Sequence, residues 1–234
     1  MGQVNKTQER QQTDTDSEQR HQQAPKPPWW AAAIGAIGLG LLFAALPERV
    51  TIGPSWLPLV LIVVTLLPFA LAGIMRRPLP HTTMRILAFV LLGIVTLALA
   101  IGVILMVVTL PDRTQTQAGS LLRTAALLWL ANILVFALWY WEVDGGGPRK
   151  RHMAGHRAAD FMFPQQAAQQ PGVNIGEWAP HFLDYVFVAF TGATALSPTD
   201  TYPLTRKAKA LMMIEALISM AIIILLAARA VNIL

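Results

Sequence analysis

The feature that most constrains the fold is a run of about 25 residues, Ile86 to Leu110, which is apolar apart from Thr96 and Thr109. A helix of roughly 20 apolar residues crosses the hydrocarbon core of a bilayer. Of the 234 residues in the chain, 54% are hydrophobic and 13% are charged. Soluble domains are usually about 25% charged. The chain is therefore predicted to be an all-α integral membrane protein.

Further apolar runs extend this prediction to about five transmembrane helices, at Trp29 to Leu46, Trp56 to Met75, Ile86 to Leu110, Leu121 to Trp141 and Leu211 to Leu234. Residues 1–28 are polar and are predicted to form a disordered cytoplasmic tail. Residues 29–141 then form a four-helix transmembrane region, residues 142–177 a polar loop, and residues 178–234 a separate C-terminal unit.

Small and polar residues within these runs predict contacts between helices. Gly35, Gly38 and Gly40 lie in the first run, and small residues allow helix backbones to approach closely in lipid. Asn132 lies near the middle of the fourth run. An amide at that depth usually forms a hydrogen bond to a neighbouring helix, and the alternative is that it lines a pathway.

The basic residues predict the orientation of the chain. Most of the 18 lysines and arginines fall on the side of the N-terminal tail and of the loop after Trp141. Positive residues stay cytoplasmic. This places the N-terminus in the cytoplasm, the C-terminus outside, and the protein in the plasma or inner membrane. No basic helix or aromatic-basic module suggests nucleic acid as a partner. The absence of cysteine excludes disulfides and cysteine nucleophiles.

The C-terminal unit has the order of a re-entrant segment. The apolar run Phe182 to Ala195 is too short to cross a bilayer, and the polar elbow Ser197-Pro198-Thr199-Asp200 follows it. The long run Leu211 to Leu234 comes next. Irregular backbone at membrane depth persists only where protein or a water-filled cavity covers it. We therefore expect a half-helix that enters from the cytoplasmic face and returns to it.

These residues resemble a known module. The stretch Asp184 to Asp200 resembles the pore helix and filter of two-helix potassium channels. Tyr202-Pro203-Leu204-Thr205 looks like the segment after such filters, and Glu215-Ala216-Leu217 falls where the inner helix often carries the same three residues. The region is also similar to the C-terminal end of an uncharacterised group of bacterial multi-span membrane proteins.

The resemblance implies a homo-oligomer, a tetramer if it is channel-like, with monovalent cations as the candidate permeant. The pore-like or filter-like positions would be Thr191, Thr194, Ser197, Pro198, Thr199 and Asp200.

The filter itself departs from the channel pattern. Ser197 and Thr199 stand where the two glycines belong, and Pro198 stands where the tyrosine belongs. The glycines of a potassium filter take left-handed dihedrals that other residues adopt only at a cost, and proline fixes its own φ. A potassium-selective filter is therefore not expected. The two hypotheses are a channel-like permeation protein and a non-conducting membrane scaffold or partner-binding protein.

Glu215 is the strongest single candidate for a functional residue, because a carboxylate is costly in lipid and must face protein or water. It is a candidate cation or proton site. The alternatives are an ion pair with Arg206, Lys207 or Lys209, or a hydrogen bond from a helix to a loop. Asp184 is explained by the helix dipole at the start of the half-helix.

The loop offers a weaker hypothesis of an interfacial enzyme. His152 and His156 have i, i+4 spacing, with Glu142, Asp144 and Asp160 near in sequence. A two-histidine metal site needs further ligands, and the neighbouring arginines and lysine would repel a cation. We therefore expect no metal, no cofactor and no enzymatic activity. The triple glycine after Asp144 predicts a tight turn.

Overall fold

The computed structural model describes residues 29–47, 81–109, 118–153, 159–167, 178–194 and 201–231. Within these ranges, three helices are long and apolar enough to cross a membrane, over Arg85–Val108, Gly119–Gly146 and Arg206–Ala228. They belong to α4 (His81–Val108), α5 (Ala118–Val143) and α9 (Arg206–Val231). The third, fourth and last predicted spans are therefore confirmed as long apolar helices, as an integral membrane protein requires.

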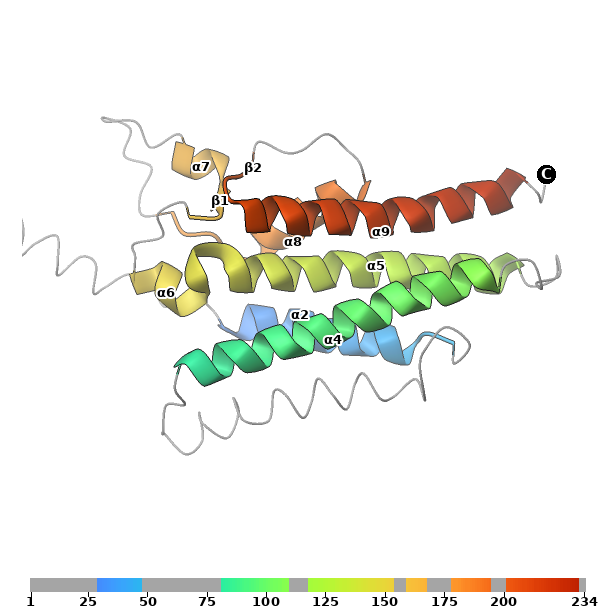
Figure 1. Ribbon diagram of the computed structural model, residues 1–234, viewed down its shortest axis with the longest axis horizontal. Coiled ribbons are helices and arrows are strands. Elements are labelled where there is room, and N and C mark those ends of the chain that lie inside the picture. Colours follow the sequence, from blue (N-terminus) through green and yellow to red (C-terminus); the bar gives the residue numbers. More distant parts are fainter. Residues whose placement is uncertain are drawn as a thin grey trace, which may run out of the picture.

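The other two predicted spans are not confirmed. The first is present as α2 (Trp29–Ala44), an apolar helix of 16 residues, shorter than the roughly 20 that a crossing needs. The second, Trp56 to Met75, lies outside the described residues, as does the predicted tail. In Figure 1, α2 ends at the opposite end of the bundle from the one at which α4 begins.

Helix α5 is the centre of the bundle and runs antiparallel to α4 and α9 (Figure 1). It packs against α2, α4, α8 (Phe182–Thr194) and α9. Of its apolar window, 61% is buried, against 22% for α9. Small residues support this central position, because Ala125, Ala131 and Ala137 are fully buried and let neighbouring helices approach closely.

Helix α4 has one buried apolar face and one exposed apolar face. Leu92, Val95, Leu99 and Met106 are buried at the three- and four-residue spacing of one helix face. The indole nitrogen of Trp139 on α5 donates a 2.8 Å hydrogen bond to the hydroxyl of Thr96. The other face of α4 carries exposed apolar side chains, among them Ile86, Val90, Ile94, Leu97 and Ile104.

The predicted close approach of α2 is confirmed at Gly35. A Cβ atom there would lie 2.6 Å from the ring of Phe182, which is closer than real Cβ atoms come. The glycine therefore allows α2 to contact the first residue of α8 and the side chain of Leu138 on α5.

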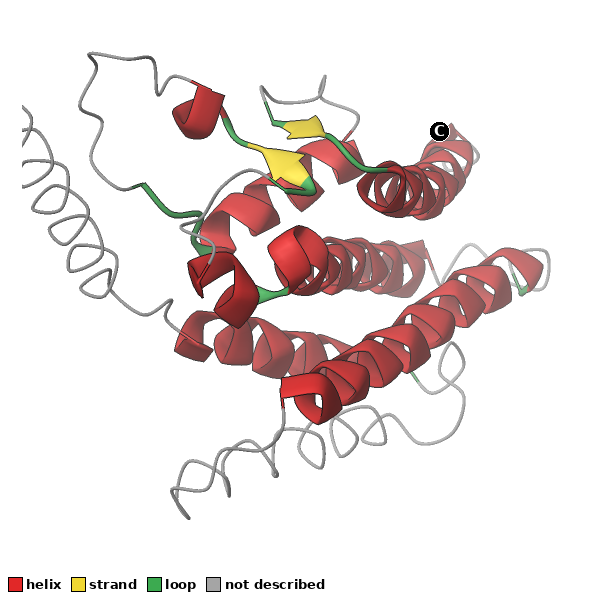
Figure 2. Ribbon diagram, turned by 60° about the vertical axis from the view of Figure 1, so that its left-hand side comes forward, coloured by secondary structure: helices red, strands yellow, loops and turns green. Residues whose placement is uncertain are grey.

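Short elements cover the end of the bundle at which α5 ends and α4 and α9 begin. They are η3 (Asp144–Gly146), α6 (Pro148–Met153), β1 (Phe161–Met162), α7 (Pro164–Ala167) and β2 (Tyr202–Pro203). The two strands pair antiparallel, Phe161 with Pro203 and Met162 with Tyr202 (Figure 2). Phe161 and Phe163 are buried, so the described part of the predicted polar loop is packed onto the bundle.

The short apolar helix of the predicted half-helix is confirmed as α8, of 13 residues. Its first turn lies near this covered end, where Phe182 contacts the ring of Trp141. Its last turn lies deep in the bundle, where the carbonyl of Ala193 meets Trp129. At about 1.5 Å per residue, α8 is about 20 Å long. The described chain resumes at Thr201 and immediately forms β2, back at the covered end.

The start of α9 is earlier than predicted. The helix begins at Arg206 instead of Leu211, because Thr205 provides an N-cap. Its hydroxyl accepts a 3.3 Å hydrogen bond from the backbone N–H of Ala208. Hydroxyl groups at this position satisfy an otherwise unpaired helix donor. The basic side chains Arg206, Lys207 and Lys209 are exposed on the first turn.

Candidate functional site

Glu215 lies on α9 and is fully buried between α5 and α8. Its Oε2 atom accepts a short hydrogen bond from the hydroxyl of Tyr140 on α5. Its Oε1 atom has no hydrogen-bond donor among the described residues. The alternative of an ion pair with Arg206, Lys207 or Lys209 is not formed within the part of the chain that the structure describes. The carboxyl group is therefore held by a phenol instead of by a charge.

Gly192 on α8 allows the half-helix to approach this carboxyl group. A Cβ atom at Gly192 would lie 3.0 Å from Oε2 of Glu215. A larger residue would therefore push α8 away from α9. The backbone of the half-helix and the buried carboxyl group are in contact because residue 192 has no side chain.

Two more side chains of α5 bind polar groups of α8 and α9. The amide nitrogen of Asn132 donates to the backbone carbonyl of Glu215 at 3.2 Å, as its depth in the span predicted. The indole nitrogen of Trp129 donates to the hydroxyl of Ser219 at 3.1 Å. The Ser219 hydroxyl in turn donates to the carbonyl of Ala193. An orphan carbonyl in the last turn of α8 is thereby satisfied by protein.

These groups form one continuous structure, which we call the polar seam. It consists of Trp129, Asn132, Tyr140, Glu215 and Ser219, with the Ala193 carbonyl. The polar side chains all face inward, between α5, α8 and α9. In an apolar surrounding, such hydrogen bonds fix how the helices pack, because breaking one leaves a polar group without a partner.

The filter-like residues are only partly described. Thr191 is buried, and its hydroxyl donates to the carbonyl of Val188 at 2.8 Å. The hydroxyl of Thr194 donates to the carbonyl of Phe190 at 2.8 Å. Both hydroxyls thus bond to their own helix. Ser197, Pro198, Thr199 and Asp200 lie outside the described residues, and their predicted roles stay predictions.

A second buried cluster lies at the covered end and was not predicted from the sequence. Oδ1 of Asp144 accepts hydrogen bonds from the backbone N–H groups of Asp160 at 3.0 Å and Phe161 at 3.2 Å. Its Oδ2 accepts a 2.6 Å hydrogen bond from the hydroxyl of Tyr185 on α8. We call Asp144, Arg151 and Tyr185 the end cluster.

Arg151 completes the end cluster with its buried guanidinium group. Its Nη1 atom donates to the carbonyls of Trp141 at 3.1 Å and Asp144 at 2.8 Å, and it lies 3.8 Å from Oδ2 of Asp144. The guanidinium also lies over the rings of Trp141 and Tyr185, at 4.8 and 5.2 Å. Burial raises the pKa of Tyr185, which lies outside the three spanning helices, well above its ordinary value. The hydroxyl therefore remains a hydrogen-bond donor.

The triple glycine makes the turn that brings these groups together. Gly145, Gly146 and Gly147 have φ values of +61°, +80° and +97°, which side chains rarely adopt. The predicted tight turn is confirmed. In the sequence, the feature that came closest to predicting the end cluster was the glycine turn directly after Asp144. That turn did not identify Tyr185 as the partner of Asp144.

The histidine hypothesis concerns residues of which little is described. The side chain of His152 and the whole of His156 lie outside the described part of the chain. Within the described part, no group of three or more histidine, aspartate or glutamate side chains is placed to hold a metal ion. Asp144 and Asp160 instead accept hydrogen bonds that organise the turn, including one from Gly145 N–H to Asp160 at 3.1 Å.

Comparisons of the chain with protein-family models, curated proteins and solved structures found no match. The fold and the site therefore define a class only, that of a mostly helical chain with three described helices long and apolar enough to cross a membrane and a buried polar seam between α5, α8 and α9.

Proposed function

We propose that the chain is a multi-pass protein of the cell membrane in which α8 and α9 form a re-entrant, pore-type unit that does not conduct ions. In this proposal the unit is a scaffold or partner-binding element and not an enzyme. The observation that carries the proposal is the direction of its polar groups. The polar seam faces α5, and its hydrogen bonds from Trp129, Asn132 and Tyr140 join α8 and α9 to the rest of the bundle.

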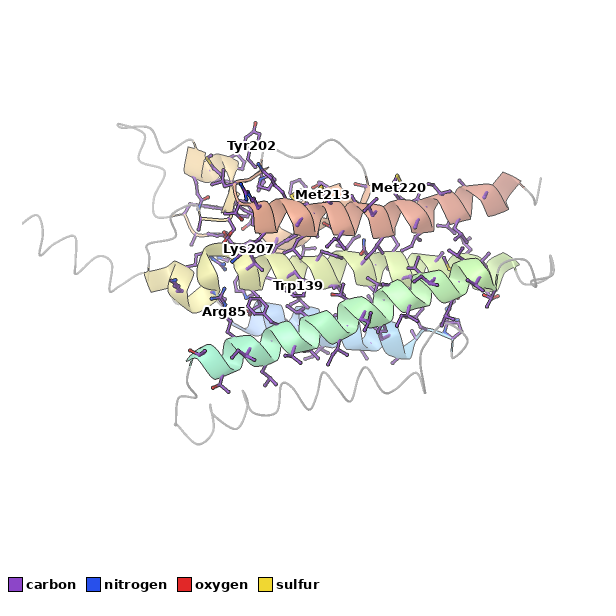
Figure 3. The ribbon with its side chains drawn as sticks, in the orientation of Figure 1. Arg85, Trp139, Tyr202, Lys207, Met213 and Met220 are labelled. Atoms are coloured by element: carbon purple, nitrogen blue, oxygen red, sulfur yellow. The ribbon has the colours of Figure 1, made fainter. Side chains whose placement is uncertain are left out.

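The outward faces of α8 and α9 support the proposal. On α8 the exposed large side chains are Leu183, Phe187 and Phe190. On α9 they include Met213 and Met220, which lie on the face turned away from α5 (Figure 3). If copies of the chain met through these faces, the passage between them would be lined by apolar groups. Apolar constrictions exclude water and ions.

The position of the two ends of the re-entrant segment supports a return to the same membrane face. The ring of Trp178 contacts Phe163, directly after β1, at 5.4 Å. Tyr202 pairs with Met162 in the same strand pair. Both residues thus lie at the covered end of the bundle, although α8 reaches far into it between them.

A second candidate function, ion permeation by a homo-oligomer, is favoured by this same return. The elbow Ser197 to Asp200 would then form the narrow part of the passage, with monovalent cations attracted by Asp200. It differs from the first proposal in requiring an axis on which the elbows of several copies converge.

Ion flux distinguishes the two candidates. We expect liposomes that contain the purified protein to release potassium no faster than empty liposomes, under a gradient and at either sign of membrane potential. An added ionophore shows that the vesicles are sealed. Flux that Asp200→Asn abolishes would overturn the first proposal and support the second.

Cysteine labelling tests the re-entrant geometry independently of conduction. The chain has no cysteine, so His181→Cys, Tyr202→Cys and Gly119→Cys each introduce one thiol. All three positions are exposed, and Gly119 lies in the first turn of α5, at the far end of the bundle. We expect an impermeant reagent to label residues 181 and 202 from one face and residue 119 from the other. Labelling of 181 and 202 from opposite faces would make this segment an ordinary crossing.

A further inference from the structure

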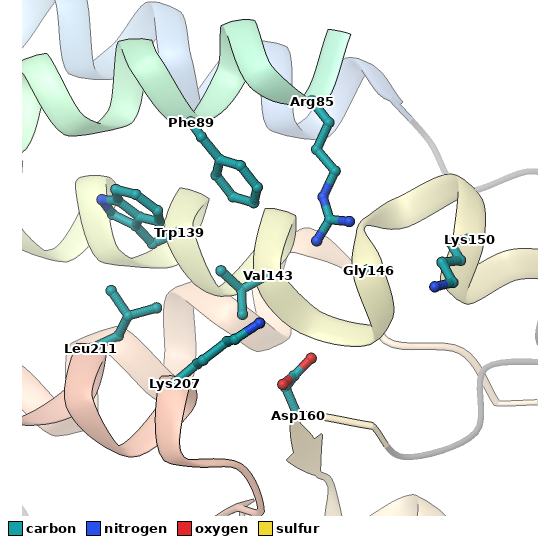
Figure 4. A pocket seen from close by; sticks show the side chains of 9 residues that line it. All are labelled: Arg85, Phe89, Trp139, Val143, Gly146, Lys150, Asp160, Lys207 and Leu211. Carbon is teal, nitrogen blue, oxygen red and sulfur yellow. The ribbon is translucent and has the colours of Figure 1, made fainter. Parts of the chain in front are cut away.

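A cavity of about 530 Å³ lies between α4, α5, α6 and α9 at the covered end. Figure 4 shows the side chains that line it, from four separate parts of the chain. The lining residues are Arg85, Phe89, Trp139, Val143, Gly146, Lys150, Asp160, Lys207 and Leu211. Its volume falls within the range of small-molecule sites, about 300–1,000 Å³.

Three cations line the cavity and only one carboxylate. Arg85 comes from α4, Lys150 from α6 and Lys207 from α9. None of them forms an ion pair with a carboxylate within the described ranges. The Nε atom of Arg85 is shielded from solvent and has no hydrogen-bond partner there either. The Glu142 carboxylate on α5 lies within electrostatic range of Arg85, so the three cations of the lining still outnumber the two carboxylates near them, Asp160 and Glu142.

The one carboxylate of the lining, that of Asp160, accepts two hydrogen bonds. Oδ1 of Asp160 accepts a 2.7 Å hydrogen bond from the hydroxyl of Thr205. Its Oδ2 accepts the hydrogen bond from the Gly145 N–H at 3.1 Å. These donors hold Asp160 in the turn at the base of α9, where it forms no ion pair with the three described cations of the lining.

One wall of the cavity is apolar. The rings of Phe89 and Trp139 stack with their centroids 5.7 Å apart, and Leu211 lies beside them. The guanidinium of Arg85 lies 5.2 Å from the centroid of the Phe89 ring. Arg85 and Arg206 are the residues at which two of the apolar spans begin. The cavity thus lies at the boundary between the polar end of the bundle and its apolar length, with cations on one side and apolar groups on the other.

We propose that this cavity binds the phosphate group of an anionic phospholipid, with Arg85, Lys150 and Lys207 around the phosphate and the acyl chain along Phe89 and Leu211. Basic pockets between transmembrane helices are suited to acidic headgroups. Arginine and lysine donate charge-assisted hydrogen bonds to phosphate oxygens. The positive residues lie on the predicted cytoplasmic side, where anionic lipids are abundant. Free phosphate shares this chemistry and lacks only the acyl chain.

Lipid titration of the full-length protein tests the proposal. The protein, in an uncharged detergent, is titrated with dioctanoyl phosphatidic acid, dioctanoyl phosphatidylcholine or inorganic phosphate, and binding is followed by tryptophan fluorescence. We expect phosphatidic acid to bind most tightly. Arg85→Gln and Lys207→Gln should each weaken it by about tenfold or more, because a charged partner is lost.

Lys209→Gln is the matched control, because Lys209 is exposed on the same turn of α9 and does not line the cavity. Lys207→Arg should retain the affinity. Variants that lose affinity should keep the wild-type unfolding temperature without lipid, since the charges they lose form no ion pair in the described structure. If inorganic phosphate bound as tightly as phosphatidic acid, the cavity would still be a phosphate site. The proposal that the phosphate belongs to a lipid would then be overturned. Equal binding of phosphatidylcholine, or an equal loss with Lys209→Gln, would overturn the proposal.

Discussion

Replacing Asp144 by alanine removes the centre of the end cluster. The side chain accepts three hydrogen bonds, from Asp160 N–H, Phe161 N–H and the Tyr185 hydroxyl. Its Oδ2 atom also lies 3.8 Å from Nη1 of Arg151, whose side chain is 2% exposed. A buried charge that loses its partner typically destabilises a protein by about 3–5 kcal/mol. We expect Asp144→Ala to lower the free energy of unfolding by an amount in that range.

Two further variants separate the parts of this effect. Asp144→Asn keeps an oxygen that can accept from the two N–H groups but removes the charge beside Arg151, so we expect a smaller loss, of about 1–3 kcal/mol. Tyr185→Phe removes one hydrogen bond to a carboxylate and should cost about 1.5–3 kcal/mol. In the Asp144→Ala background it should cost almost nothing, because the hydroxyl then has no carboxylate to bind.

The assay is unfolding by sodium dodecyl sulfate in mixed micelles, followed by circular dichroism. Asp184→Ala is the matched control, since it removes a half-buried carboxylate whose partner is the His181 N–H at 2.6 Å. Loss of such a helix cap costs about 0.5–2 kcal/mol. The reasoning would be refuted if Asp144→Ala were no more destabilising than Asp184→Ala, or if its effect and that of Tyr185→Phe were additive.

The remaining predictions concern the polar seam and the glycine turn, measured in the same assay. Tyr140→Phe removes the described donor of the buried Glu215 carboxyl group and should cost about 1–3 kcal/mol; no change would mean that another group binds the carboxyl. Gly192→Val places a Cβ 3.0 Å from that group and should cost about 1–3 kcal/mol, whereas Gly93→Val, which meets nothing within 4 Å, should stay within about 0.5 kcal/mol. Gly146→Ala at φ +80° should cost about 1–2 kcal/mol, and wild-type stability would contradict the backbone argument.

Local patterns in the sequence predicted several of the described helices and one turn, but not the strand pair of β1 and β2. The apolar run after Ile86 predicted α4, and the short run from Phe182 predicted α8 to within one residue. The triple glycine predicted its turn. These features depend on length, composition and backbone freedom, each of which a short stretch of chain carries by itself. The start of α9 was placed five residues late, because a charged first turn gives no apolar signal.

The candidate site was only partly predictable. The cost of a carboxylate in lipid identified Glu215, and the depth of Asn132 predicted its bond to a neighbouring helix. Neither argument identified Tyr140 as the partner of Glu215, which lies 75 residues away in the chain. Basic residues near in sequence suggested an ion pair instead.

By itself, the sequence determined the positions of three helices long and apolar enough to cross a membrane, and of a short apolar helix before the last one. Only the tertiary structure decided that the polar groups of α8 and α9 face α5, and that Arg85, Lys150 and Lys207 surround one cavity. The physical reason is that the tendency of a helix to enter lipid depends on the composition of that segment alone. A hydrogen bond or a shared cavity depends on which segments the packing brings together.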